Sequence, residues 1–201
     1  MKPTEKLMNE HKSIELILCI LTKIADDIKS NKVFYTTDVE KIVNFLFIYV
    51  DKYHRTKEEK AFFPALLSAK IQLENDPISL MINEHTISKG YLKEIKCCIE
   101  NCKIGSTFSC GRIADCMKNY VALIQHHIQK EETDYFPMAN KALSEEAQNE
   151  ISEQFFQIDK EFSVSFLNEQ FMEFLSAMEA KYLNDKFNNQ KIDNNENRIY
   201  Y

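Results

Sequence analysis

Two twelve-residue stretches of the chain share a pattern of side chains that could bind a metal. Residues 53–64 read YHRTKEEKAFFP and residues 126–137 read HHIQKEETDYFP, with six of the twelve positions identical. In each copy a histidine precedes a glutamate by four residues: His54 and Glu58, His127 and Glu131. Residues four apart lie on one face of a helix, so each copy presents an imidazole and a carboxylate together.

Two further histidines lie on apolar helical stripes of their own. His11 and His85 each end the tripeptide NEH. Each lies in a stripe of apolar residues that recur at helical spacing. Four predicted helices therefore direct one histidine each, and two of them a glutamate as well, into one interior.

Such a polar set is too costly to bury without a partner. An unpaired polar group in an apolar interior costs about 2–7 kcal/mol, against a typical domain stability of about 5–15 kcal/mol. The stripes hold no matching set of Arg or Lys. Imidazole with carboxylate suits iron, zinc or manganese, and two carboxylates among four imidazoles predict a dinuclear centre bridged by Glu58 and Glu131. The predicted metal ligands are His11, His54, Glu58, His85, His127 and Glu131.

Neighbouring polar residues receive other interpretations. His126 lies about 100° round the helix from His127, so we predict a surface position or an indirect role. Glu59 and Glu132 are most simply solvated charges, with hydrogen bonds to ligand imidazoles as the alternative. Tyr120 is most simply a core residue, with a hydrogen bond near the metals as the alternative.

The elements that must position these residues are four long helices. We expect the first from a cap at Thr4 to about Lys29, and the second from a capping box at Thr37–Glu40 until Pro64 kinks or ends it. The third begins at Asp76–Pro77, and the fourth follows a loop around Gly105–Ser106 and meets Pro137.

These helices predict an all-α fold, an antiparallel up-down four-helix bundle. The two halves, helices 1–2 and 3–4, have nearly equal histidine separations and predict a pseudo-twofold repeat. We expect residues 1–143 to form the bundle and residues 144–185 to add one or two helices packed on it or on a partner. The Asn-rich residues 186–201 are predicted to be a disordered tail.

Composition excludes several function classes. The net charge of −6 comes without a basic block, which argues against nucleic acid as a partner. The longest apolar runs are too short to span a bilayer, so we predict a cytoplasmic protein without membrane contact. The six cysteines are expected to be reduced thiols. Cys98, which follows Cys97, and Cys102 lie one helical turn apart and could share a helix face. The alternative interpretation is that they bind a soft metal or respond to oxidation.

At this point the sequence resembles the hemerythrin-like, or HHE cation-binding, family over roughly residues 3–143. The resemblance rests on Glu10-His11, His54 with Glu58-Glu59 and Phe63-Pro64, Glu84-His85, and His127 with Glu131-Glu132 and Phe136-Pro137. It implies a four-helix bundle around a non-haem di-iron centre of the Fe-O-Fe type.

The motif departs from that of oxygen-carrying hemerythrins. Those proteins have a further histidine in HxxxH on the third helix and an aspartate in HxxxxD on the fourth. Here the positions four residues before and after His85 are Met81 and Lys89, so HxxxH is absent. On the fourth helix a glutamate, Glu131, lies four residues after His127. The four-His, two-Glu pattern is similar to the branch that includes repair-of-iron-centres proteins, which implies a role in nitric oxide and oxidative stress.

The leading hypothesis is a di-iron protein that binds, senses or reduces dioxygen, nitric oxide or peroxide, which includes a possible di-iron oxidoreductase. The alternative is an iron donor, an iron-centre repair protein or an iron-oxygen sensor. It would act through a homodimer or protein partner at the C-terminal helices. A third hypothesis is a structural zinc bundle.

Overall fold

The computed structural model describes residues 1–69, 77–103, 107–162, 164–184 and 198–199, and nearly all of them are helical. In the first half the elements are α1 (Pro3–Lys29), β1 (Phe34–Tyr35), α2 (Thr36–Phe45), the π-helix η1 (Leu46–His54), α3 (Arg55–Lys57), the π-helix η2 (Glu58–Phe62) and α4 (Phe63–Ser68). In the second half they are α5 (Pro77–Lys103), α6 (Thr107–Lys130), the π-helix η3 (Glu131–Tyr135), α7 (Phe136–Ala142), α8 (Glu145–Glu161), α9 (Val164–Tyr182) and β2 (Arg198–Ile199).

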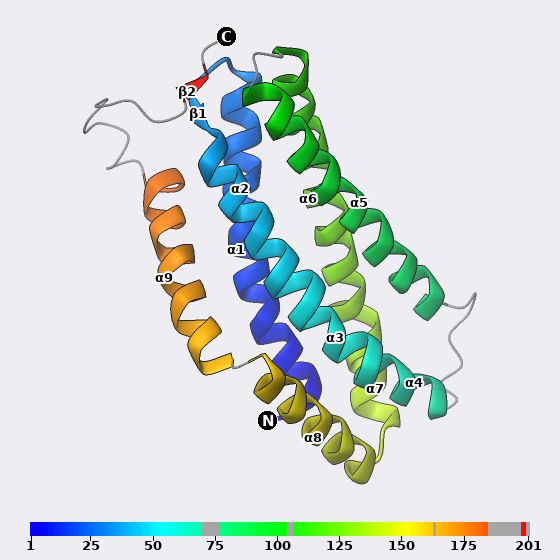
Figure 1. Ribbon diagram of the computed structural model, residues 1–201. Helices are drawn as coiled ribbons and strands as arrows, with labels where there is room; N and C mark the ends of the chain where they lie inside the picture. The colour runs from blue at the N-terminus through cyan, green and yellow to red at the C-terminus, as the bar shows by residue number, and fades with distance from the viewer. Residues whose placement is uncertain (70–76, 104–106, 163, 185–197, 200–201) are drawn as a thin grey trace.

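Four long helical segments lie side by side in Figure 1: α1, the segment from α2 to α4, α5, and the segment from α6 to α7. Helix α1 packs against α6, α6 against α5, and α5 against α2, while η1 contacts both α1 and α5. The predicted all-helical class is confirmed. None of the described helices is both long and apolar enough to cross a membrane.

Both copies of the repeated Phe-Pro dipeptide lie just after a π-helical stretch. Stretch η2 ends directly before Phe63-Pro64, and η3 ends directly before Phe136-Pro137. A proline lacks an N–H and its ring clashes with the carbonyl four residues back, and a π-helical turn is wider than an α-helical one. Pro64 does not end its helix, because α4 continues to Ser68 after the π-helical turn, and the kink at Pro64 stays a prediction.

Two predicted helix caps are wrong. Helix α1 begins at Pro3, with Lys2 as its cap residue, and Thr4 lies inside the helix, where its hydroxyl donates to Asn140 Oδ1 at 3.0 Å. Helix α2 begins at Thr36, before the expected capping box at Thr37, and shows no side-chain cap. The third helix begins at Pro77 as predicted. Asp76 and the loop around Gly105–Ser106 lie outside the described residues.

The C-terminal residues add two helices to the bundle. The Ser144 side chain caps α8 by accepting from the Ala147 N–H at 3.1 Å. Helices α8 and α9 both contact α1, so the segment after Ser144 packs on the same chain. Strand β2 pairs antiparallel with β1, whereas the rest of the predicted disordered tail, 186–197 and 200–201, lies outside the described residues.

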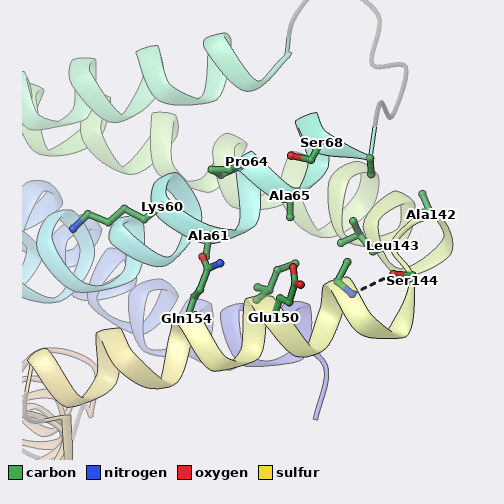
Figure 2. Close-up of a pocket in the computed structure, with 13 residues that line it drawn as sticks. Lys60, Ala61, Pro64, Ala65, Ser68, Ala142, Leu143, Ser144, Glu150 and Gln154 are labelled. Carbon is green, nitrogen blue, oxygen red and sulfur yellow. Dashed lines mark hydrogen bonds between the residues drawn. The ribbon is translucent and has the colours of Figure 1, made fainter.

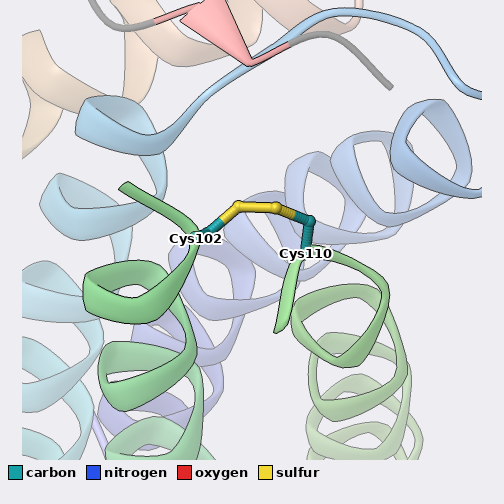
Figure 3. Close-up of a disulfide and its surroundings, with 2 residues drawn as sticks. All are labelled: Cys102 and Cys110. Carbon is teal, nitrogen blue, oxygen red and sulfur yellow. A yellow bond between two sulfur atoms is a disulfide. The ribbon is translucent and has the colours of Figure 1, made fainter. Parts of the chain in front are cut away.

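One disulfide corrects the expectation of reduced cysteines. Cys102, near the end of α5, is bonded to Cys110, near the start of α6, with Cα atoms 5.4 Å apart (Figure 3). That separation suits a disulfide, and the short connection between two packed helices brings the residues together. Cys97 and Cys98 remain free thiols. The proposed pairing of Cys98 with Cys102 in a soft-metal site is not found, because Cys102 is already bonded.

The apolar core forms two clusters along the bundle. One contains Ile14 and the later buried residues of α1, and the other contains Leu7 of α1 together with Ile151 and Phe155 of α8. His11 lies between Leu7 and Ile14 on the same buried face. The predicted polar site is thus a layer between two apolar clusters.

Candidate metal centre

Each of the four long helical segments contributes one buried histidine to a single cluster. His11 lies on α1, His85 on α5 and His127 on α6, while His54 is the last residue of η1. All four are at most 4% exposed. Glu58 and Glu131, the first residues of η2 and η3, are fully buried beside them. All six residues singled out from the sequence therefore meet in the structure.

The donor atoms of these six residues form two overlapping groups. Within each group all ligand atoms lie within 4.8 Å of one another: His11, His54, Glu58 and Glu131 in one, and Glu58, His85 and His127 in the other. Glu58 joins the groups, since its Oε1 lies 2.8 Å from His54 Nε2 and its Oε2 lies 3.4 Å from His85 Nε2. Glu131 lies between the opposite pair, with Oε2 3.3 Å from His11 Nε2 and Oε1 3.7 Å from His127 Nε2.

Several buried atoms of the cluster lack a hydrogen-bond partner among the described residues. They are His11 Nε2 and both carboxylate oxygens of Glu58 and of Glu131. Leaving a buried polar group unsatisfied costs about 1–3 kcal/mol, and more for a charged group. Imidazole nitrogens and carboxylate oxygens aimed at one another are a donor set that fits a divalent cation. The residues present therefore fit a metal.

The electrostatics of the metal-free cluster are uneven. Burial opposes the charge on His54, but Glu58 and Glu10 outweigh it and raise the pKa of His54 to about 10. Burial likewise opposes the charge on Glu58, but His54 holds the pKa of Glu58 well below its usual range. Burial, with Glu58 nearby, raises the pKa of Glu131 to about 8, and burial together with His54 lowers the pKa of His11. At neutral pH one imidazole–carboxylate pair is charged and the other is neutral.

A second layer of carboxylates orients the imidazoles. The Nδ1–carboxylate pairs are His54 with Glu10 at 2.8 Å, His11 with Glu132 at 2.8 Å, His85 with Glu59 at 2.6 Å, and His127 with Glu84 at 2.9 Å. Because an ionised carboxylate only accepts, each Nδ1 carries a proton and each Nε2 faces the cluster, where a metal could take its lone pair in place of any proton. We call these four glutamates the supporting carboxylates.

The supporting carboxylates revise the sequence interpretation. Glu59 and Glu132 are not merely solvated charges, because each accepts a hydrogen bond from an imidazole, as the alternative proposed. The roles of Glu10 and Glu84 were missed. The signal for both was present in the sequence, because each directly precedes a site histidine in the repeated NEH.

Two other candidates lie where the simpler interpretation put them. His126 is exposed on α6 and is not part of the cluster. Tyr120 is fully buried in the larger apolar cluster, and its hydroxyl has no hydrogen-bond partner among the described residues. Its predicted hydrogen bond near the metals stays a prediction.

A buried arginine fixes α5 at the site. Arg55, next to His54, donates to the backbone carbonyl of His85 at 3.1 Å and to the Ser88 hydroxyl at 2.6 Å. Its charge is paired with Asp51 at 3.1 Å, and Asp51 is also within 3.0 Å of Lys89. The backbone that carries His85 is therefore held by the helical segment that carries His54.

Helix α8 reaches the site through a buried lysine. Lys57 is fully buried and forms ion pairs with Glu10 and, at 2.9 Å, with Asp159 of α8. The Tyr53 hydroxyl donates to Asp159 at 2.8 Å and accepts from Lys57. A residue of the C-terminal segment thus contacts the groups that hold a supporting carboxylate.

The cavity in Figure 2 lies away from this cluster. It has a volume of about 480 Å³ and lies between η2–α4 and α8, lined by residues that include Lys60, Pro64, Glu150 and Gln154. The six cluster residues are not among those that line it. The cavity offers small and mixed side chains and no convergent set of buried polar groups.

Comparison with known proteins agrees with the geometry. A family model described as the Hemerythrin HHE cation binding domain matches residues 2–139. No curated protein and no solved structure matched the chain. The matched residues include all six members of the cluster and all four supporting carboxylates.

Proposed function

Because the chain belongs to the hemerythrin HHE cation-binding family, we propose that its buried cluster holds two iron ions and that the protein binds, senses or reduces a small oxidant. The observation that carries the proposal is a set of six buried side chains whose imidazoles are oriented by four carboxylates, and several of their donor atoms have no hydrogen-bond partner in the described part of the chain. The proposal includes an antiparallel up-down bundle with a pseudo-twofold axis between the halves.

The ligands divide naturally between two positions. His11 and His54 would hold one ion, and His85 and His127 the other. Glu58 and Glu131 would bridge them, since each carboxylate lies between imidazoles of both pairs. Buried Nδ1–H donors to carboxylates keep each Nε2 aimed at the metal positions, where a bound metal would displace the proton that His54 carries without it.

Aromatic rings restrict what can reach the cluster. Phe136 stacks on His11 with ring centroids 5.6 Å apart, and Phe63 stacks on His85 at 6.1 Å. These rings cover part of the cluster and favour a small ligand over a large organic substrate. Iron in such a site would supply an electron donor and open coordination positions for dioxygen, nitric oxide or peroxide.

The alternatives make different predictions about metal and partner. A structural zinc bundle would contain zinc after growth in iron-replete cells. An iron donor, repair protein or sensor would bind its partner differently with and without metal. Exposed Phe156 and Met172 of the C-terminal helices are the residues such a partner or a second copy would cover.

Absorption spectroscopy of the iron-loaded protein tests the proposal. Protein loaded anaerobically with Fe(II) is exposed separately to dioxygen, nitric oxide and hydrogen peroxide, with a Glu58→Ala/Glu131→Ala variant as the control. We expect a new absorption band with at least one oxidant, absent from the variant. Iron-loaded protein that shows no change with any of the three would contradict the proposal.

A further inference from the structure

The two pairs of histidines are supported differently, although the sequence that carries them is repeated. We define the first half-site as His11 and His54 with Glu132 and Glu10, and the second half-site as His85 and His127 with Glu59 and Glu84. Resting on the proposed two-metal site, we infer that Asp159, Lys57 and Tyr53 are positioning residues that make a metal leave the first half-site more slowly than the second.

The network begins at His54 and ends on α8. Glu10 accepts from His54 Nδ1 through Oε2 and from Lys57 through Oε1. Lys57 is 2.9 Å from Asp159 Oδ1, and Tyr53 connects to the same oxygen at 2.8 Å. Asp159 also pairs with Lys6 of α1. Lys57 and Tyr53, which both face Glu10, are therefore each held by Asp159 as well.

The corresponding positions in the second half-site are more open. Lys130 stands where the repeat has Lys57, and it contacts Glu84 at 2.6 Å with 28% of its side chain exposed. His126 stands in place of Tyr53 and is exposed. The side chain of Glu59, the other supporting carboxylate of the second half-site, is 43% exposed, whereas that of Glu132 in the first half-site is 31% exposed. Helix α8 contacts α1 and α3, which carry His11, Glu10 and Lys57, and it also contacts η2.

Release of a metal requires its imidazole to turn away. In the first half-site this rotation must break the bond to Glu10, which Lys57 and Tyr53 also hold in place. In the second half-site Glu84 is held by one partly exposed lysine, and solvent can replace it. Replacing a group that hydrogen-bonds to a metal ligand typically changes metal affinity by about 10–100-fold. Asp159 contacts Lys57 and Tyr53 rather than the ligand's own hydrogen-bond partner, so we expect a smaller effect.

Chelator-driven release measures the difference directly. The full-length chain is loaded anaerobically with two equivalents of Fe(II) and mixed with excess colorimetric Fe(II) chelator, and release is followed with time. Wild type should release iron in two phases of equal amplitude. Glu10→Gln should accelerate only the slow phase, and its counterpart Glu84→Gln only the fast phase, which assigns each phase to a half-site.

Asp159→Asn is the decisive variant. It should accelerate the slow phase by about 3–10-fold, somewhat less than removal of a direct supporting group, and leave the fast phase unchanged. Asp159→Glu should restore the slow phase at least in part. Glu161→Gln, an equal charge change at an exposed position of the same helix, should leave both phases unchanged.

Three results overturn the inference. They are a single release phase in wild type, equal acceleration of both phases by Asp159→Asn, or no effect of that variant on the slow phase. Equal acceleration would assign Asp159 a purely structural role. Wild-type protein that binds two irons and releases them in a single phase would contradict only the difference in release rate between the half-sites. Wild-type protein that binds fewer than two irons would contradict the proposed two-iron site as well.

Discussion

The first and second half-sites share their donors and differ in what lies behind them. Both present two imidazoles, and both place a carboxylate on each Nδ1. Behind the first lies a fully buried lysine under α8, and behind the second lies a partly exposed lysine. The comparison teaches that the repeat supplies the chemistry, while the segment outside the repeat determines how firmly each half is held.

The largest expected difference comes from the two lysines. Lys57→Met should lower the free energy of unfolding of the metal-free protein by about 3–5 kcal/mol, because it leaves Glu10 and Asp159 without their buried cation. Lys130→Met, at the corresponding position, should cost at most about 1 kcal/mol. Urea denaturation measures both variants. Equal losses would mean that α8 does not distinguish the half-sites.

Reducing the disulfide should weaken the helices of the second half-site. Cys102 and Cys110 close a short loop between α5 and α6, which carry His85 and His127. Cys102→Ser/Cys110→Ser should therefore lower the free energy of unfolding by about 2–3 kcal/mol. Cys97→Ser, a free and exposed thiol on α5, is the matched control and should change it little. A double variant as stable as wild type would show that the bond does not constrain the unfolded chain.

The uneven charge of the cluster predicts a pH dependence for the metal-free protein. His54 and Glu131 have pKa values raised from 6.5 to about 10 and from 4.5 to about 8. Between pH 6.5 and 8 the folded chain therefore binds more protons than the unfolded chain. Its free energy of unfolding should fall over this window by about 3 kcal/mol.

Chemical denaturation at several pH values tests this window. Glu131→Gln should flatten the decline, because an amide cannot lose a proton there. Stability that rises from pH 6.5 to 8 in metal-free wild type would contradict the charge assignment. Bound metal should reverse the trend, since it competes with these protons for the ligands.

The smallest effect should separate Tyr53 from His126, its counterpart in the repeat. Tyr53→Phe removes a buried hydroxyl that bonds Asp159 and Lys57 and should cost about 0.5–1.5 kcal/mol. His126→Phe replaces an exposed side chain and should change stability by no more than about 0.5 kcal/mol. Thermal unfolding of both variants is sufficient, and a larger loss for His126→Phe would contradict the placement of the network.

The six cluster residues could be predicted from the sequence, because a polar residue within an apolar helical stripe must be buried together with that stripe. Glu10 and Glu84 could not be placed without the structure, because each supports a histidine on another helix, and only the packing register decides which. Asp159 lies more than one hundred residues from Lys57 in a segment with no repeat partner, so its contact depends on how α8 folds back.

Local chemistry misled the sequence analysis in two places. The expected cap at Thr37 is wrong because α2 begins at Thr36 with Tyr35 as its cap residue, which puts Thr37 inside the helix. The cysteines were expected to be reduced because their spacing matches no disulfide framework. The bond between Cys102 and Cys110 follows from the packing of α5 on α6 rather than from spacing.

The central claim, a two-metal centre within the buried cluster, is tested most directly by anomalous diffraction at the iron edge from crystals of the iron-loaded protein. We predict two anomalous peaks, one bounded by His11, His54, Glu58 and Glu131 and one by His85, His127 and Glu58. A single peak, or peaks elsewhere on the chain, would contradict the claim and leave the repeated residues without the function proposed.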